Sequence, residues 1–376
     1  MTDSAGPAGP GGAAEPAHAS TDDGPAHARF TLQRDLRKRL DKYLGDRIPW
    51  LSRTSLQRLI AESAVTVNGR APKASTKLRK GDVVDVILPP TPSSDLPAED
   101  IPIAILHEDD DLLIVDKHDD IIVHPARGNQ SGTLINGLAW HLRQTGGGSL
   151  SGVGADQARP GVVHRLDRHT TGVMVVAKNE TAHWRLGKQF EQRRTRKRYL
   201  ALVHGTVEPT TDVIDLPLGK HPTIKHRNAV RWDDTGKQAV TLYRVLESYG
   251  DFSLVEVELR TGRTHQIRVH LSHLGWPIAG DDLYGGRHIE VRDILPPDQS
   301  EGDRRRPLLQ RQALHAAMLG FTHPTTEKDV EFQAMLPQDM AELIGLLRSR
   351  GPVHRPATTG TVLNVDALLP PHGAVE

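Results

Sequence analysis

The segment RPGVVHRLDRHTTG, residues 159–172, places a single carboxylate in a polar loop between two apolar runs that are typical of buried strands. The carboxylate is Asp167, and Arg165 and Arg168 lie close to it in the chain. Cationic neighbours favour the ionised form of a carboxylate, and an ionised carboxylate on a loop at a sheet edge suits a nucleophile or a base. An ordinary ion pair that pins a turn would give the same pattern, so the charges alone leave both interpretations open.

On both sides of this loop, short apolar runs alternate with polar turns up to about residue 347. Runs typical of strands outnumber those typical of helices and cluster in pairs, which favours an α+β domain over a doubly wound one. We therefore expect a central mixed, mostly antiparallel sheet. The expected strands are 112–115, 121–123, 173–176, 200–203 and 252–259, and the expected helices are 181–194, 265–274 and 337–348.

Residues 34–88 have a different pattern, in which two amphipathic helical stretches precede short alternating runs. Val65 and Val67 alternate into Asn68-Gly69, a pair strongly preferred in two-residue hairpin turns. A proline-rich linker follows this compact module. The helices of the module carry many cations on their polar side. These cations could bind a partner or could simply face solvent: Arg34, Arg37, Lys38, Arg39, Lys42, Arg53 and Arg58.

The composition limits the class of protein. The 376 residues have no net charge at pH 7, 37% are hydrophobic and none is cysteine, which excludes disulfides and thiolate metal sites. No apolar run suits a membrane-spanning helix, and the N-terminus lacks the apolar core of a secretory signal, so a cytoplasmic location is expected. Charge is uneven, with seven basic residues against one acid in 185–198, and such patches decide where a phosphate backbone can bind.

Several motifs resemble those of the RluA/RluD family of RNA pseudouridine synthases, fused to an N-terminal S4 RNA-binding domain. HRLD at 164–167, followed by TTG at 170–172, is similar to the active-site motif of that family. The resemblance covers residues 34–345. Its S4 part rests on RLDKYL at 39–44, LSRTSLQRLI at 51–60 and VTVNG at 65–69. Its catalytic part rests further on IVHP at 122–125, SGTL at 131–134, KRYLALV at 197–203, LRTGRTHQIRVHL at 259–271, GD at 280–281, YG at 284–285 and RQALHA at 311–316.

The resemblance implies that the chain isomerises uridine to pseudouridine in RNA without cofactor or metal. Asp167 would be the catalytic aspartate, which attacks C1′ or takes a proton from C2′. Tyr199 would stack on the target base and accept the C5 proton, and Arg268 would pair with the catalytic carboxylate. The fusion to an S4 domain resembles the branch of the family that modifies large-subunit ribosomal RNA. We expect the protein to be a monomer. The expected RNA contacts are Arg39, Lys42, Arg53, Arg58, Arg165, Arg168, Lys197, Arg263 and His265.

Composition and the resemblance together imply the division of the chain. We expect a disordered acidic tail at 1–29, an S4 domain at 30–90, a linker at 91–100, a catalytic domain at 101–350 and a flexible tail at 351–376.

One motif departs from the family. Where the family has Lys-Pro-x-Gly, this chain has Lys117-His118-Asp119-Asp120, so aspartates must form the turn.

Two other functions are conceivable. A catalytically degenerate RNA-binding protein or chaperone would keep the S4 module but would not need Asp167, Tyr199 and Arg268. A glycosidase would need a second carboxylate facing Asp167, and the nearest candidate in the motifs is the Asp281-Asp282 pair.

Overall fold

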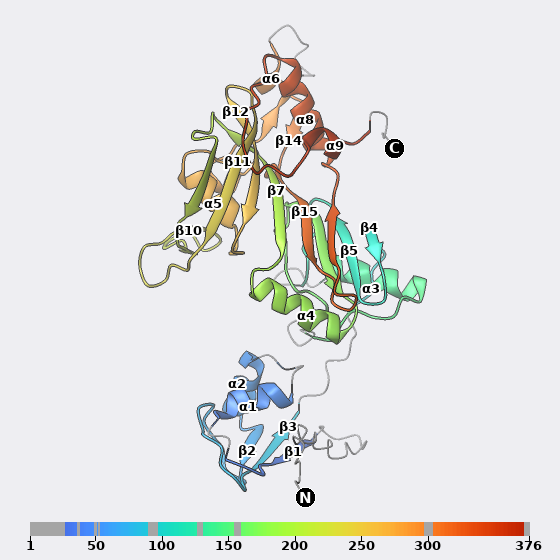
Figure 1. The fold of residues 1–376 in the computed structure, drawn as a ribbon, viewed down its shortest axis with the longest axis vertical. Helices are drawn as coiled ribbons and strands as arrows, with labels where there is room; N and C mark the ends of the chain where they lie inside the picture. The colour runs from blue at the N-terminus through green and yellow to red at the C-terminus, as the bar shows by residue number, and fades with distance from the viewer. Residues whose placement is uncertain are drawn as a thin grey trace, which may run out of the picture. The chain divides into compact units, whose positions relative to one another are not determined.

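The computed structural model describes residues 27–35, 38–48, 51, 53–88, 97–125, 131–153, 159–296 and 304–371, without the side chains of 53–55. The chain divides into two compact units, Met1–Asp95 and Leu96–Glu376 (Figure 1). Each unit has its own apolar core.

The N-terminal unit contains two helices and a three-stranded antiparallel sheet. The helices are α1 (Leu40–Arg47) and α2 (Arg53–Ala61), and the sheet has the order β1 (His27–Thr31), β3 (Val83–Ile87), β2 (Val65–Val67). Apolar residues from both helices and all three strands form its core.

Two sequence-based expectations for this unit need correction. The tail was expected to reach residue 29, but His27 to Arg29 already belong to β1 and pair with β3. The turn at Asn68-Gly69 forms, and both residues have positive φ, as a two-residue hairpin turn requires. The chain after that turn makes only one bridge, between Val67 and Arg70, and β2 pairs instead with the later strand β3.

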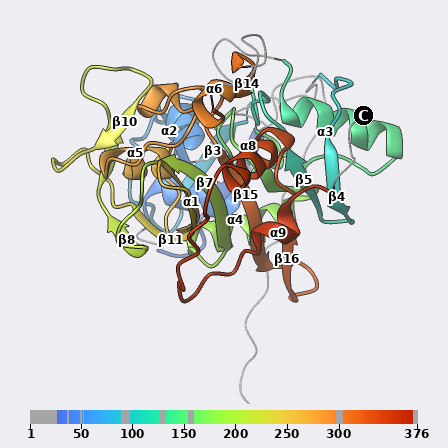
Figure 2. The same cartoon turned by 90° about the horizontal axis from the view of Figure 1, so that it is seen from above.

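The large unit is built on a nine-stranded mixed sheet (Figures 1 and 2). Only β6 and β15 run parallel, so the sheet is mostly antiparallel and the expected α+β fold is confirmed. The order is β4 (Ala104–Glu108), β5 (Leu112–Lys117), β6 (Thr171–Ala177), β15 (Leu314–Thr322), β7 (Arg196–His204), β12 (Phe252–Leu259), β11 (Val240–Ser248), β8 (Thr211–Asp215), and β16 (Asp329–Gln333) pairs with β15.

Helices and two small ribbons surround this sheet. The three expected helices form as α4 (Glu180–Glu191), α5 (Gln266–His273) and α8 (Gln338–Ser349). The smaller elements are α3 (Leu134–Thr145), the 3₁₀ turn η2 (Asp282–Tyr284), α6 (Val291–Ile294), α9 (Val365–Leu368), the ribbon of β9 (Leu218–Lys220) with β10 (Asn228–Val230), and the ribbon of β13 (Ile289–Glu290) with β14 (Pro307–Leu309).

The expected strand at 121–123 does not form. Its residues make one isolated bridge, between Ile122 and Thr133. The carbonyls of Ile122 and Val123 instead accept the first backbone N–H groups of α3, from Leu134 and Ile135. Those N–H groups have no partner inside a helix, so the apolar run serves as the cap of α3.

The C-terminal segment was expected to be flexible, and this expectation is wrong for residues 351–371. The carboxylate of Glu256, buried on β12, accepts the backbone N–H groups of Val362 and Leu363, each at 2.9 Å. The Leu336 N–H donates to the carbonyl of Leu368, and the Leu363 and Leu368 side chains are buried. A few apolar side chains and one buried acceptor are therefore sufficient to order this segment.

Candidate active site

The loop that carries Asp167 leads directly into β6, between two strands of the central sheet. Gly172 lies at the start of β6 with φ of 109°, opposite Ala316 of β15. A Cβ atom at Gly172 would lie 2.3 Å from the carbonyl oxygen of Ala316, so no other residue fits. The glycine of the TTG motif thus allows the parallel pairing that fixes where the loop ends.

Two buried cations hold the backbone of the loop immediately after Asp167. The Lys117 ammonium, which is fully buried, donates to the carbonyl oxygens of Arg168 at 2.8 Å, His118 at 2.9 Å and Ile121 at 3.0 Å. Burial lowers the pKa of Lys117 to about 8, and the charge of Asp119 acts in the opposite direction. Two of the ammonium protons bond within the 117–121 turn, and the third joins that turn to the catalytic loop.

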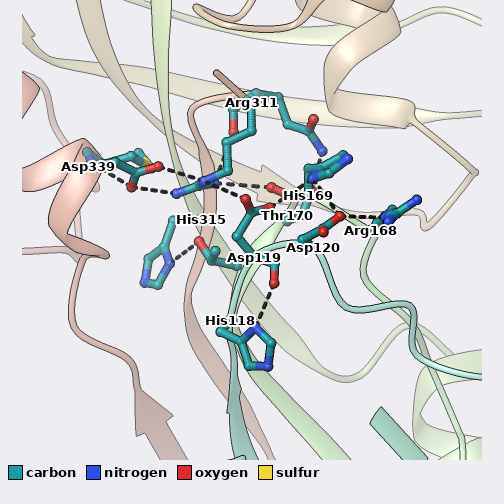
Figure 3. Close-up of polar contacts among 12 residues, drawn as sticks. His118, Asp119, Asp120, Arg168, His169, Thr170, Arg311, His315 and Asp339 are labelled. Atoms are coloured by element: carbon teal, nitrogen blue, oxygen red, sulfur yellow. Dashed lines mark hydrogen bonds and ion pairs between the residues drawn. The ribbon is translucent and has the colours of Figure 1, made fainter. Parts of the chain in front are cut away.

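The second cation is Arg311, at the entrance to β15 (Figure 3). It makes a bidentate pair with Asp339 of α8, at 2.7 and 2.8 Å, and donates to the carbonyl of His169 at 3.1 Å. Since a buried guanidinium is costly without partners, the pair with Asp339 explains how it can stay at this position. Two consecutive carbonyls, those of Arg168 and His169, are therefore fixed by cations from different parts of the chain.

The unusual 117–120 turn contacts the same loop through its aspartates (Figure 3). Asp120 adopts φ of 57°, the conformation that a glycine would otherwise supply, and accepts from Arg168 Nε at 2.7 Å. Asp119 contacts His169 Nδ1 at 2.9 Å. Both ion pairs are largely exposed, so each contributes little to stability. The turn that lacks proline and glycine nevertheless closes against the catalytic loop.

A cavity of about 470 Å³ opens beside this loop, within the range of small-molecule pockets. Asp167, Tyr199 and Arg268, which come from the loop, β7 and α5, all line it. The structure therefore brings together the three residues expected to be catalytic. Other lining residues come from the catalytic loop, the end of α4, the loop before α5, the start of α5, and the ends of β7, β12 and β15: Val163, His164, Arg165, Leu166, Thr170, Phe190, Glu191, Arg193, Lys197, Leu259, Thr261, Gly262, Arg263, Thr264, His265, Gln266, Ile267 and Leu314.

Arg268 contacts two carboxylates, one that lines the cavity and one that is buried and held in a bidentate pair. Its Nη1 lies 3.4 Å from Asp167 Oδ2, while Nε and Nη2 bond to Asp281 at 2.6 and 2.7 Å. Burial alone would lower the pKa of Arg268, but the hydrogen bonds and charge of Asp281 and the charge of Asp167 outweigh it and raise the pKa. Asp281 is fully buried and does not line the cavity, so of the two carboxylates that contact Arg268 only Asp167 faces the cavity.

Tyr199 is almost completely buried, with 8% of its surface exposed. Burial and, to a smaller extent, the negative charge of Asp167 raise the pKa of its phenol well above the usual range. The residue is therefore a neutral phenol at physiological pH. A neutral phenol is a weak base, which favours stacking on a base over proton acceptance as its part in a reaction.

His265 lies beside Asp167 and contacts Tyr284, which packs against Arg268. His265 begins α5 with φ of 58°, and its Nδ1 lies 2.8 Å from the Tyr284 hydroxyl, which also accepts the backbone N–H of Asn228 at 2.9 Å. Burial lowers the pKa of His265, so the imidazole is neutral near pH 7. Donation by the phenol to Nδ1 then leaves the imidazole proton on Nε2, which lies 3.9 Å from Asp167 Oδ2.

Comparisons with known proteins identify the family of this chain. A family model described as RNA pseudouridylate synthase matches residues 111–273. The RNA pseudouridine synthase YlyB of Bacillus subtilis (strain 168), itself uncharacterised, is 42% identical over 84% of this chain and 95% of its own. The chain belongs to the RNA pseudouridine synthase family. Its activity is therefore an isomerisation, and its substrate is RNA.

Two further proteins are similar to this synthase. The ribosomal large subunit pseudouridine synthase D of Nitrosomonas europaea is 42% identical over 83% of this chain and 85% of its own. The solved structure titled human RNA Pseudouridylate Synthase Domain Containing 4 matches 67% of this chain and 94% of its own, with 26% identity and a TM-score of 0.49. None of the described helices of the synthase is long and apolar enough to cross a membrane.

The expected RNA contacts of the catalytic unit do not all lie in one place. Arg165, Lys197, Arg263 and His265 line the cavity beside Asp167. Arg168 does not line it, because its side chain turns towards Asp120. Burial, then the nearby Arg193, lowers the pKa of Lys197.

The alternation of β7 divides the basic run that precedes Tyr199. Lys197 and Tyr199 lie on the cavity side of the strand. Arg198 points to the opposite face, where it pairs with Glu258, and Arg196 lies close to Glu331. Only part of the run can therefore contact RNA at the active site, as the two-residue period of a strand requires.

The expected contacts in the N-terminal unit are partly exposed. Lys42 and Arg58 are exposed and make no ion pair with the residues that the structure describes. Arg39 is bound to the buried Asp41 by two hydrogen bonds of 3.0 Å, so part of its donor capacity is already used. The side chain of Arg53 lies outside the described residues.

Asp109, Asp111 and His323 are close enough together to suggest a metal site. Their hydrogen bonds argue against one. His323 Nδ1 accepts the backbone N–H groups of Thr325 and Thr326, so its proton is on Nε2 and is donated to Asp109 at 2.9 Å. No lone pair remains on that imidazole for a metal ion.

Sequence reasoning missed four residues that support the site. Lys117, Asp281 and Tyr284 lie in stretches that the resemblance to the family already singled out, and so does Arg311. For the three charged residues the signal that could have found them is charge. Lys117 follows the apolar run 112–115 and Asp116, and Asp281 accompanies Gly280 in a short motif, where a buried ionised group requires a partner.

Proposed function

We propose that this synthase isomerises specific uridines of large-subunit ribosomal RNA, with Asp167 as the nucleophile or base. Several relatives, including the one from Nitrosomonas europaea, carry the name ribosomal large subunit pseudouridine synthase D. The N-terminal unit resembles an S4 domain in sequence and has exposed cations on its helices. We also propose that the enzyme acts as a monomer and that it is located in the cytoplasm, as its lack of cysteines suggests.

The reaction exchanges one glycosidic bond for another within the same nucleotide. The C1′–N1 bond breaks, the detached uracil turns, C5 bonds to C1′, and the C5 proton is lost while N1 gains one. Asp167 either attacks C1′ or removes the C2′ proton to give a glycal-like intermediate. The base must first leave its stack, and a cavity of about 470 Å³ that contains Asp167 can receive a flipped nucleotide.

The observation that carries this proposal is the position of Asp167 between Arg268 and the cavity. Arg268 Nη1 lies 3.4 Å from Asp167 Oδ2 and places a positive charge beside this carboxylate. Tyr199 lines the same cavity with its phenol neutral, which supports stacking of the uracil against it. Lys197 and Arg165 supply positive charge for the adjoining phosphates.

The rival functions have weaker support. A glycosidase needs a second carboxylate that faces Asp167 across the substrate, and the candidate in the motifs, Asp281, is buried and already bonded to Arg268. A degenerate RNA-binding protein would have no need for a catalytic loop whose backbone is held by Lys117 and Arg311.

Two measurements test the proposal. Tritium release from C5-labelled uridine in RNA should occur with the wild-type enzyme and disappear in Asp167→Asn, because an amide can neither attack C1′ nor accept a proton. Turnover by a folded Asp167→Asn enzyme would refute the assigned mechanism. Pseudouridine mapping of total RNA, with and without the gene, should reveal sites lost from large-subunit ribosomal RNA, and losses confined to transfer RNA would refute the substrate.

A further inference from the structure

A half-buried arginine without an acidic partner lies beside the active site, at the tip of the β9–β10 ribbon. Arg227 makes no ion pair with any residue that the structure describes, and its buried Nε has no hydrogen-bond partner there. Its terminal nitrogens are not among the buried unpartnered atoms and remain accessible. An unpaired guanidinium of this kind has donors available for an anion.

Arg227 is held in place by an aromatic ring that also contacts the catalytic machinery. Its Cζ lies 5.1 Å from the centre of the Tyr284 ring, and Arg268 Cζ lies 4.9 Å from the same centre. The neighbouring Asn228 donates its backbone N–H to the Tyr284 hydroxyl and its side-chain amide to the Thr264 carbonyl, at 2.9 and 2.8 Å. The hairpin tip is thus anchored to the loop that borders the cavity.

The stretch of chain on either side of Arg227 is basic. The stretch 216–232 contains no aspartate or glutamate. Lys220 and Lys225 in this stretch are exposed and unpaired within the described residues. Asp282 is the exposed acid on the turn that carries Tyr284, and in the described part of the chain no ion pair joins it to the hairpin cations.

We propose that the tip of the β9–β10 ribbon binds a phosphate of the RNA strand next to the target uridine, with Arg227 as its anchor. The proposal rests on the proposed function for the identity of the anion as RNA. A guanidinium suits phosphate because its planar set of donors matches the phosphate oxygens. The stacking on Tyr284 fixes the guanidinium in advance, so less side-chain freedom is lost when the phosphate binds.

Salt dependence distinguishes a phosphate contact from a structural role. Each phosphate neutralised on a single strand contributes about 0.7 to the slope of log affinity against log salt. Arg227→Gln should therefore reduce the slope by about 0.7 and weaken binding roughly tenfold at low salt. Arg227→Lys keeps the charge and should keep the slope, even though its stacking on Tyr284 is poorer.

The probe is a 12-residue oligouridylate, and its affinity is measured in an Asp167→Asn background between about 50 and 200 mM salt. Arg292→Gln is the matched control, because Arg292 is a half-exposed arginine on α6 that is already paired with Glu290. The expected result is a smaller slope for Arg227→Gln alone. An unchanged slope in Arg227→Gln, or an equal reduction in Arg292→Gln, would overturn the phosphate site.

Pseudouridine formation by the enzyme with active Asp167 is measured in parallel on cellular ribosomal RNA. A reduced slope for Arg227→Gln without pseudouridine formation by the wild type would keep the anion site and reject the proposed function. Pseudouridine formation together with an unchanged slope would reject the anion site alone.

Discussion

Arg268 binds Asp281 through two short hydrogen bonds and reaches Asp167 through a single longer contact of 3.4 Å. The two carboxylates therefore share one guanidinium unequally. Asp281 uses the strong bidentate geometry, which neutralises most of the buried charge. Asp167 keeps oxygen lone pairs directed to the cavity, where a substrate can meet them.

Asp281→Asn should lower kcat by at least about tenfold. The neutral amide cannot balance the positive charge of the Arg268 guanidinium. Arg268 should therefore turn towards Asp167 and bind the carboxylate oxygen that Asp167 needs for the reaction. Removing one charge of a buried pair should also reduce the free energy of unfolding, by about 3–5 kcal/mol. Single-turnover kinetics and urea unfolding measure the two effects. Asp282→Asn is the control, because Asp282 is the exposed neighbour on the same turn, and equal kinetics in both variants would contradict the role of Asp281.

Tyr199→Phe should retain affinity for RNA and a chemical rate within about tenfold of the wild type, since stacking is kept and a phenol with a raised pKa is a weak base. Tyr199→Ala should lose about 1–3 kcal/mol of binding through loss of base stacking. Binding and single-turnover assays separate these effects. A chemical step abolished in Tyr199→Phe with normal affinity would restore the hydroxyl as the proton acceptor at C5.

Much of the site could be predicted from the sequence because its chemistry lies in short contiguous motifs. The loop with Asp167 and the helix with Arg268 were identified, and the structure places both beside one cavity. The link between Arg268 and Asp281 could not be predicted from spacing, because it forms only when α5 packs against the η2 turn. The hold of Arg311 on the His169 carbonyl likewise spans 142 residues of the chain.

Other predictions differ from the structure because a local sequence pattern does not show which distant residues will contact it. The apolar run around Ile122 has the composition of a strand, but its carbonyls cap α3. The C-terminal segment is poor in apolar residues, yet the buried carboxylate of Glu256 supplies an acceptor for its backbone. The division of the basic run on β7 could have been predicted, since Lys197 and Arg198 must point to opposite faces of a strand.

The rate of isomerisation should fall as the pH rises through about 8, because Lys117 then loses the proton that it needs for its third hydrogen bond. Burial places its folded pKa at about 8, below the value of 10.5 for an unfolded lysine. Between those values the unfolded chain binds more protons, so this group makes the free energy of unfolding increase with pH. The loss of activity should therefore occur without any loss of stability from Lys117.

The assignment to Lys117 can be tested through its neighbours. The charge of Asp119 raises the pKa of Lys117 more than that of Asp120 does. Asp119→Asn should shift the alkaline loss of kcat to lower pH, and Asp120→Asn should shift it less. Rates at saturating RNA from about pH 6.5 to 9.5, with urea unfolding at each pH, provide the measurement, because this range brackets a pKa of about 8. Identical pH profiles of kcat in the wild type, Asp119→Asn and Asp120→Asn would exclude Lys117 as the group whose titration causes the loss of activity.

The last prediction concerns the division of work between the two units. Deleting residues 1–95 should weaken RNA binding and flatten its salt dependence, while the chemical step survives at saturating enzyme. The two units have separate apolar cores, and Asp167, Tyr199 and Arg268 all belong to the second. Exposed cations such as Lys42 and Arg58 should contribute salt-dependent affinity for phosphates and little selection of bases.

Charge substitutions in the full-length enzyme give the matched test of that prediction. Replacing Lys42 and Arg58 together with glutamine should reproduce part of the change in salt slope, about 0.7–0.9 for each phosphate that is no longer neutralised. Arg29→Gln should change the slope less, because Arg29 is already paired with Asp85. Single-turnover assays with increasing enzyme then decide the role of the unit. A chemical step that stays absent at saturation after the deletion would mean that the N-terminal unit orients the RNA for reaction, and an affinity role would be refuted.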